Sequence, residues 1–577
     1  MTDAVSTPTG ALLPRNSKPT IAHRVRRAGG VVIHHAKKHT GVGIVCAVAY
    51  FDPGNWGVDL QAGSEFGYRL LFVVLLAGLF AVYLQVLATR LGCVTGIDLA
   101  SHSRLLLYNR PKHTRLYRWL GLYPLYVLAE VAIIATDLAE LLGSAIAMSM
   151  LFPQLELWQG VLITAFDVLL VFAMGDPLRG RPVKMFELLI AALVLAVLIC
   201  MIVIISKVDV NWGDAFVGYV PSKYIFASGG VYTSVGILGA TVMPHSLFLG
   251  SALATQDRIS FRGTQNVSDL TPVNSKESEE SLPAKLVEET SFVRRLYEYC
   301  KESVLAAFRR PPPSCHSSVA TSHSEHRNNP LEFVRAHLYH GTFDVVGSLL
   351  GFAVMINSLI LMLAAAVFFY GTEHTNTDGP ASLFDAYDLI RDLVGQPAAT
   401  LFAIALLCAG QSSSIIATVA GQAVSEGFIQ WRVSPVMRRL ATRLLAIIPS
   451  MAVAIIVGRK GIDTLLVTSQ VVLSIVLPFI TFPLLYCTSN KAIMTVRRTG
   501  PSTLVRSETA SSETLAADLQ SPGLENRSPD MTENADTDEV VDYSNNRLTI
   551  YIGVAIWLVI VAANFYVIVE LGLGKGM

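Results

Sequence analysis

Long apolar stretches recur along most of this chain, and they constrain its fold more than any other feature. Eleven can be recognised, most of them close to the roughly 20 residues that an α-helix needs to cross a bilayer. They lie at about 43–64, 70–92, 120–148, 158–174, 186–206, 229–254, 343–370, 397–424, 440–457, 464–487 and 549–571. Charged residues are only 15% of the chain, against roughly 25% in soluble proteins. The sequence therefore predicts an all-α polytopic membrane protein with about eleven transmembrane helices.

Three polar segments separate or precede the apolar regions. Residues 1–42 are basic, 255–330 are rich in Ser, Glu, Arg and Pro, and 488–547 are acidic and rich in Ser and Thr. None could bury a hydrophobic core, so we predict all three to be disordered. The predicted membrane regions are residues 43–254 with helices 1–6, 331–487 with helices 7–10, and 548–577 with helix 11 and a short C-terminus.

The distribution of lysine and arginine predicts the orientation, since cytoplasmic loops carry an excess of both. If the N-terminus is cytoplasmic, 37 of the 44 basic residues fall on the cytoplasmic side or at cytoplasmic helix ends. The reverse orientation would put the same 37 outside. We therefore expect a cytoplasmic N-terminus, and the polar segments become cytoplasmic loops where trafficking or ubiquitin machinery could act. The plasma membrane and an endosomal or vacuolar membrane both remain open as the location.

The first apolar stretch is interrupted near its middle by residues that disfavour a helix. Residues 52–55 read Asp-Pro-Gly-Asn, only about half a bilayer from the start of the stretch. Proline lacks the N–H that a helix interior needs, and glycine lowers the cost of leaving helical geometry. The sixth stretch has a similar interruption at Met243, Pro244 and His245. Because freed backbone at membrane depth is tolerated where it lines a cavity or binds something, we expect two broken helices rather than two ordinary proline kinks.

The two breaks occupy corresponding places if helices 1–5 and 6–10 form two units. Five is an odd number, so the second unit starts on the opposite side of the membrane and the repeat is inverted. Its two broken helices then meet near the bilayer midplane, which is the plan of many secondary transporters. The spacing therefore predicts a binding site where helices 1 and 6 cross.

The residues at the breaks are suited to a divalent transition metal. Carboxylate, amide and carbonyl oxygens alone would suit magnesium or calcium, whereas a thioether gives little to hard cations and is accepted by manganese(II), iron(II), cobalt(II) and cadmium(II). The thioether of Met243 therefore favours a transition metal over a hard cation. The candidate ligands are Asp52, Asn55, Met243, the backbone carbonyls of Ala49 and Ala240, and Gln470. A hydrogen bond between helices is an equally good interpretation of Gln470.

A second group of ionisable residues suggests a route for protons. Glu130, Asp137 and Glu140 lie on one face of the predicted helix 3, and carboxylates in a membrane helix are by default functional. We interpret them as a relay that passes protons from the metal site to the cytosol, with His245 as the nearby group that titrates closest to neutral pH. The alternatives are structural pairing with arginines such as Arg443 of helix 9, and a purely hydrogen-bonded role for His245.

Several classes of function find no support in the sequence. The net charge is zero, which gives no reason to expect a nucleic-acid partner. Seven cysteines include no CxxC pair, so a zinc site or a disulfide scaffold is not expected. Serine-hydrolase, metalloprotease and phosphate-loop motifs are absent from the sequence, so we expect neither an enzyme nor a bound cofactor.

At these residues the sequence resembles the natural resistance-associated macrophage protein (Nramp) family of proton-coupled divalent metal transporters. The motifs are DPGNW at 52–56, ATDLAELLG at 135–143, GATVMPHSLFLGSAL at 239–253, GQSSSIIATVAGQ at 410–422, TRLLAIIPS at 442–450 and SQVVLSIVLPF at 469–479. The long loops after helices 6 and 10 are similar to those of fungal members. The resemblance implies a leucine-transporter-like fold, manganese and iron as substrates, proton symport and alternating access. It also implies the metal and proton roles given above, Arg443 included.

Two other classes of protein stay open at this stage. A metal sensor or signalling receptor on the same fold would carry a large folded soluble domain, whereas both long loops have the composition of disordered chain. A sodium-coupled amino-acid transporter would leave a half-helix N-terminus free for the substrate carboxylate, which Asp52 would repel.

Overall fold

The computed structural model describes residues 41–164, 184–227, 229–258, 320–371, 382–431, 434–456, 458–497 and 540–573, with the single positions 178, 301 and 305. The first half contains α2 (Val42–Val48), α3 (Pro53–Phe66), η1 (Gly67–Leu70), α4 (Leu71–Thr95), α5 (Leu99–Leu107), α6 (Thr114–Tyr117), η2 (Arg118–Leu122), α7 (Tyr123–Leu151), α8 (Leu157–Thr164), α10 (Lys184–Ile205), α11 (Trp212–Val217), η4 (Lys223–Phe226), α12 (Gly230–Thr241) and α13 (Pro244–Leu253).

The second half begins after the long loop. It contains α15 (Leu331–Ser348), η6 (Leu349–Val354), α16 (Met355–Ala364), η7 (Ala365–Phe369), α17 (Leu383–Leu393), α18 (Gln396–Ile429), α19 (Pro435–Ile456), α20 (Arg459–Ser489), α21 (Lys491–Met494), β1 (Thr495–Arg497), β2 (Val540–Asp542) and α23 (Arg547–Gly572). The elements η6 and η7 are single π-helical turns on either side of α16.

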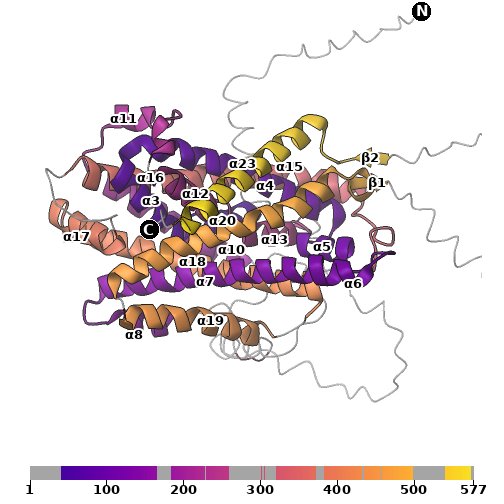
Figure 1. Ribbon diagram of the computed structural model, residues 1–577, viewed down its shortest axis with the longest axis horizontal. Coiled ribbons are helices and arrows are strands. Elements are labelled where there is room, and N and C mark those ends of the chain that lie inside the picture. The colour runs from indigo at the N-terminus through magenta and orange to yellow at the C-terminus, as the bar shows by residue number, and fades with distance from the viewer. Residues whose placement is uncertain are drawn as a thin grey trace, which may run out of the picture.

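The helices form one elongated bundle, with α7 and α18 running side by side through it (Figure 1). The helices α10 and α20 pack against this pair, α8 and α19 pack against α7 and each other, and α23 packs on α20. The short broken helices α2, α3, α12 and α13 are enclosed by the longer ones, and their residues are almost all buried. Outward-facing side chains of the peripheral helices are apolar, such as Leu195 of α10 and Leu558 of α23, as expected for surfaces that face lipid.

Seven helices in the described part of the chain are long and apolar enough to cross a membrane. The predicted count of eleven exceeds this number for identifiable reasons. The first two predicted helices merge into the continuous span Pro53–Thr95, and α7 carries three carboxylates. Helix α8 ends at Thr164, where the described part of helix 4 ends, and the apolar part of α19, Leu440–Ile456, is shorter than a full span. The membrane character of the fold is therefore clear, and the number of eleven helices stays a prediction.

The predicted boundaries of the disordered segments need correction at their margins. Residues 320–330 belong to the fold, since the Asn329 side chain donates to the Cys93 carbonyl at 2.9 Å and the Asn328 side chain donates to the Ile493 carbonyl at 2.7 Å. Residues 491–497 and 540–547 form α21, a two-stranded antiparallel sheet and the start of α23. Polar composition misled the prediction here, because these margins are held by backbone and amide hydrogen bonds and by a few apolar side chains, Ile493, Met494 and Val496, which join the core. The central parts of both segments, and residues 1–40, lie outside the described residues.

One carboxylate from α15 holds the beginning of α2. The Asp344 Oδ2 atom accepts the backbone N–H of Gly43 at 2.7 Å and that of Gly41 at 3.2 Å. These amides belong to the first turn of a helix, which has no intrahelical acceptors for them. The end of α2 that lies farthest from the break in helix 1 is therefore capped by a residue about 300 positions away in the sequence.

We expect the Asp344→Ala substitution to loosen α2 from the bundle. Loss of a helix cap costs about 1–2 kcal/mol, enough to raise the population of the loosened helix roughly fivefold or more. Cys46 lies on α2 with no exposed surface, so its labelling by a maleimide reports this opening. The labelling rate should rise in Asp344→Ala and much less in Asp344→Asn, which keeps one acceptor oxygen. A Cys46→Ser background corrects for the other cysteines, and an unchanged Cys46 rate in Asp344→Ala would contradict the assignment.

Candidate functional site: two broken helices

The first break lies between α2 and α3. Helix α2 ends at Val48, and Asp52 is extended with φ −65° and ψ 170° before α3 begins at Pro53. The Asp52 Oδ1 atom accepts the backbone N–H of Asn55 at 2.9 Å, which makes Asp52 the N-terminal cap of α3. Because Pro53 has no N–H, the carbonyl of Ala49 four residues earlier cannot receive the usual helical hydrogen bond.

The second break, between α12 and α13, has the same local design. Helix α12 ends at Thr241, Met243 is extended with φ −72° and ψ 117°, and α13 begins at Pro244. The carbonyl of Ala240, four residues before Pro244, loses its helical partner for the same reason. In both breaks a candidate ligand therefore stands directly before the proline, and a freed alanine carbonyl stands three residues before that ligand.

The candidate ligands are all buried. Exposed surface is at most 1% for each of Asp52, Asn55, Met243, Ala49, Ala240 and Gln470. Within the described residues, three of their side-chain oxygens have no hydrogen-bond partner: Asp52 Oδ2, Asn55 Oδ1 and Gln470 Oε1. Buried acceptors without donors are costly and rare in folded proteins. Their presence is the property expected of groups that receive a cation.

Helix α20 brings Gln470 against both breaks. A Cβ atom at Gly54 of α3 would overlap the Gln470 side-chain amide, and one at Gly239 of α12 would overlap the Gln470 backbone carbonyl. The absence of a Cβ atom at Gly54 and Gly239 lets Gln470 lie this close to both helices. Gln470 therefore lies against α3 two residues after Asp52 and against α12 one residue before Ala240.

Two further amides, which the sequence analysis missed, support the broken helices. Gln85 of α4 accepts the Tyr50 hydroxyl at 2.8 Å and the Ser246 hydroxyl at 3.3 Å, so it connects the first break to α13. The Asn357 side-chain amide of α16 donates to the Tyr50 carbonyl at 2.8 Å. Polar residues inside apolar stretches were visible in the sequence, but their partners lie too far along the chain to be recognised there.

His245 lies one residue beyond Pro244 and faces α7. Its Nδ1 atom is 3.3 Å from the Thr136 Oγ1 atom, and the Thr136 hydroxyl donates its only proton to the Ala132 carbonyl at 3.0 Å. The His245 Nδ1 must therefore carry the proton in this contact, which leaves a lone pair on Nε2. That buried Nε2 atom has no hydrogen-bond partner in the described part of the chain.

The three carboxylates of α7 all point into the protein. Asp137 and Glu140 are fully buried, and Glu140 accepts the Ser413 hydroxyl of α18 at 2.6 Å. Glu130 forms an ion pair with Arg438 of α19, with Nη2 at 2.8 Å from Oε1 and 3.0 Å from Oε2. The three carboxylates therefore face protein and not lipid, as expected for charged groups in a membrane helix.

An arginine of α19 pairs with α7, as in the structural alternative that named arginines such as Arg443. The arginine that holds Glu130 is Arg438, five residues before Arg443. The side chain of Arg443 lies outside the described residues. A further carboxylate of the first broken helix, Asp59, was also missed, although an acidic residue inside an apolar stretch is itself a signal. Asp59 is buried in α3 seven residues after Asp52, on the same helical face.

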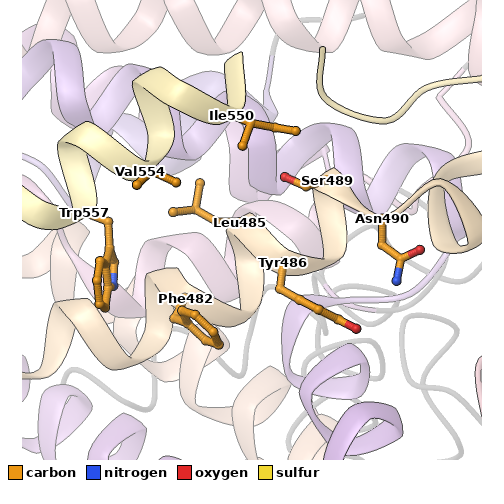
Figure 2. A pocket seen from close by; sticks show the side chains of 8 residues that line it. All are labelled: Phe482, Leu485, Tyr486, Ser489, Asn490, Ile550, Val554 and Trp557. Carbon is orange, nitrogen blue, oxygen red and sulfur yellow. The ribbon is translucent and has the colours of Figure 1, made fainter. Parts of the chain in front are cut away.

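A surface groove in the described part of the chain lies elsewhere, between α20 and α23 (Figure 2). It has a volume of about 470 Å³, and Phe482, Tyr486, Val554 and Trp557 are among the side chains that line it. Phe482, Tyr486 and Val554 are each more than 40% exposed, as expected for apolar side chains in contact with lipid. This groove therefore does not coincide with the buried oxygen acceptors.

Comparison with known proteins supports an assignment to a family. The family described as natural resistance-associated macrophage protein-like matches residues 43–282 and 314–512. The manganese transporter pdt1 of Schizosaccharomyces pombe is 39% identical over 93% of this chain and 86% of its own length. The iron transporter SMF3 of Saccharomyces cerevisiae is 34% identical over 94% of this chain and 98% of its own length.

The structural comparison agrees with the sequence comparison. A crystal structure of a mutant of the Eremococcus coleocola manganese transporter superposes with a TM-score of 0.60 at 26% identity, covering 91% of this chain and 85% of that one. The predicted fold class, an all-α polytopic membrane protein, is thereby confirmed. This chain belongs to the natural resistance-associated macrophage protein family, whose members are transporters and not enzymes.

Proposed function

We propose that this protein imports divalent transition metals, manganese(II) and iron(II) first among them, by symport with protons. The observation that carries the proposal is the set of buried, unpartnered oxygens beside two proline-broken helices, with Met243 at the second break. The names of the relatives, manganese transporter and iron transporter, favour the same cargo. The metal is the transported substrate, and no cofactor is required.

The donor set explains the preference for transition metals. Asp52, Asn55 and the carbonyls of Ala49 and Ala240 are hard oxygen donors that would bind calcium or magnesium as well. Met243 adds a polarizable sulfur, which contributes to binding of d-block ions and little to binding of hard cations. Gln470, which already lies against both breaks, would join the set when the site closes around the ion.

The Asp52→Asn substitution should abolish metal uptake. It keeps the size of the side chain and the acceptor for the Asn55 amide, but it removes the only negative charge in the proposed donor set. Uptake of manganese(II) by purified protein in proteoliposomes measures the effect, and gel filtration checks the fold. Asp388→Asn, at an exposed carboxylate of α17, is the matched control and should transport normally. Normal uptake by Asp52→Asn would remove Asp52 from the site.

The Met243→Ala substitution should retain manganese transport while allowing calcium to compete. Without the sulfur, only oxygen donors remain, and these do not separate the two ions well. We expect the ratio of calcium to manganese affinity to rise by about tenfold, which corresponds to about 1.4 kcal/mol. Competition uptake in liposomes measures this ratio, with Met355→Ala, at a partly exposed methionine, as the control. Discrimination as sharp as that of the parent would contradict the proposed role of Met243.

For the proton, we propose a path from His245 through the carboxylates of α7. The contact between His245 and Thr136 supports the first step, because it leaves the His245 Nε2 lone pair able to accept a proton. Asp137 and Glu140 follow one and four residues after Thr136, and Glu130 lies six residues before Thr136 on the same helix. We also assign Arg443 to this path. It belongs to α19 and follows Arg438, the arginine that pairs with Glu130, by five residues.

An exchange of charges separates a relay role of Glu130 from a structural one. The single variants Glu130→Arg and Arg438→Glu should each destabilise the protein, since they leave one buried charge without its partner. The double variant restores the ion pair in reverse, so the fold and metal uptake should return. If Glu130 carries protons, metal-driven acidification inside the liposomes, read with an internal pH dye, should stay low in the double variant. Full recovery of acidification would assign Glu130 a structural role only.

We further propose that the N-terminus is cytoplasmic and that transport proceeds by alternating access. The buried state of the ligands and the Asp344 cap on α2 support an occluded arrangement, from which α2 could swing away to release the ion. A membrane potential favours entry by roughly 2.3 kcal/mol per charge per 100 mV. The plasma membrane or an endosomal or vacuolar membrane would supply this potential. Trafficking or ubiquitin machinery would act on the long loops, whose central parts lie outside the described residues.

A further inference from the structure

Two histidines and a cysteine gather at the end of the bundle where α4 and α20 terminate, away from the two helix breaks. His102 lies on α5, His323 in the segment before α15, and Cys487 near the end of α20. One ligand atom from each lies within 4.8 Å of the other two. His102 and Cys487 are fully buried, and His323 is partly exposed. The three side chains come from parts of the chain that are more than 150 residues apart.

We propose that His102, His323 and Cys487 form a second metal site, for a borderline transition metal such as zinc(II), iron(II) or cobalt(II). Two imidazoles and one thiolate are the donors that such ions prefer, and hard cations gain little from them. With three protein ligands, the fourth tetrahedral position would hold a water molecule. This proposal is independent of the transport function assigned to the helix breaks.

The spacing of the donors is close to what a metal requires. Tetrahedral zinc with nitrogen at about 2.1 Å and sulfur at about 2.3 Å places its donors roughly 3.3–3.6 Å apart. The His102 Nδ1 and His323 Nε2 atoms are 3.0 Å apart, and the rings are stacked at 5.2 Å between centroids. The Cys487 sulfur lies within 4.8 Å of both histidines' ligand nitrogens, so the approach that it needs is at most roughly 1.2 Å, a shift within reach of side-chain rotation.

Hydrogen bonds already orient His102 for this role. The Thr95 hydroxyl donates its proton to the Leu91 carbonyl at 2.7 Å, so its oxygen must accept from the His102 Nε2–H, 2.9 Å away. The His102 Nδ1 atom therefore keeps its lone pair and faces His323. Metal-binding histidines are commonly held through their second nitrogen in this way.

The segment that carries His323 is fixed to the rest of the protein. The His326 Nε2 atom donates to the Thr95 carbonyl at 2.7 Å, and the Asn329 backbone donates to the Val94 carbonyl at 3.0 Å. On the other side, the Asn328 side chain donates to the Thr495 carbonyl at 2.8 Å, beside the end of α20. The site is therefore largely formed before a metal binds, and only local movements are needed.

Binding would release one proton. The Cys487 thiol loses its proton to solvent as the metal–sulfur bond forms. His323 moves its proton from Nε2 to Nδ1 by exchange with water, so that Nε2 can bind the metal. The His102 tautomer does not change.

Cobalt(II) binding to the purified full-length protein tests the proposal. A cobalt–thiolate bond gives an intense charge-transfer absorption that oxygen and thioether ligands do not produce. We expect this absorption in the parent and, at one ion per chain, in Asp52→Ala, in which the proposed transport site is disabled. It should disappear in Cys487→Ser, and cobalt affinity should fall about tenfold or more in His323→Gln.

Matched variants make the result specific. Cys93→Ser removes another buried cysteine, and His326→Gln removes a histidine that neighbours the cluster but is not a proposed ligand. Both should keep the absorption. If Cys487→Ser fails to fold, the partly exposed His323 decides the outcome, since its replacement leaves the bundle intact. Absence of the absorption in the parent, its persistence in Cys487→Ser, or unchanged affinity in His323→Gln would each overturn the proposal.

Discussion

The absence of two backbone amide protons, at Pro53 and Pro244, is the constraint on which this structure depends. Each proline deprives an alanine carbonyl, four residues earlier, of its helical partner and places an extended residue before a new helix. In lipid such freed groups would be prohibitively costly, so they must be enclosed by protein or satisfied by a ligand. The long helices α7, α18 and α20 provide the enclosure.

The enclosure is completed by amides and carboxylates from distant parts of the chain. Gln85 joins the first break to α13, Asn357 satisfies the Tyr50 carbonyl, and Gln470 lies against both breaks. Asp344 caps the far end of α2. These side chains allow short helical pieces to persist at membrane depth, where each piece alone would be too short to span the bilayer. A few polar groups thus replace the continuous hydrogen-bond ladder that the prolines remove.

The local sequence was sufficient to predict where the two helices break, but not which distant side chains hold the broken ends. Asp52-Pro53 and Met243-Pro244 act through their own neighbours, so their effect on the backbone could be predicted from a few residues. The Asp344 cap and the Asn357 contact join residues about 300 positions apart, and no periodicity encodes such pairs. Arg438 and Arg443 lie in the same basic stretch, and the sequence does not show that the rotation of α19 against α7 brings Arg438 to Glu130. The metal and proton roles remain predictions that rest on chemistry.

The long insertion between α13 and α15 leaves and re-enters the bundle at almost the same place. Arg258, where α13 has ended, lines one small cavity with Cys93, and Asn329 is bonded to the Cys93 carbonyl. A chain that departs and returns at neighbouring points closes a loop whose entropy changes only slowly with length. Evolution can therefore lengthen, shorten or replace this insertion with little loss of stability in the membrane-spanning part. The insertion is thus a place where different lineages can acquire different sequences.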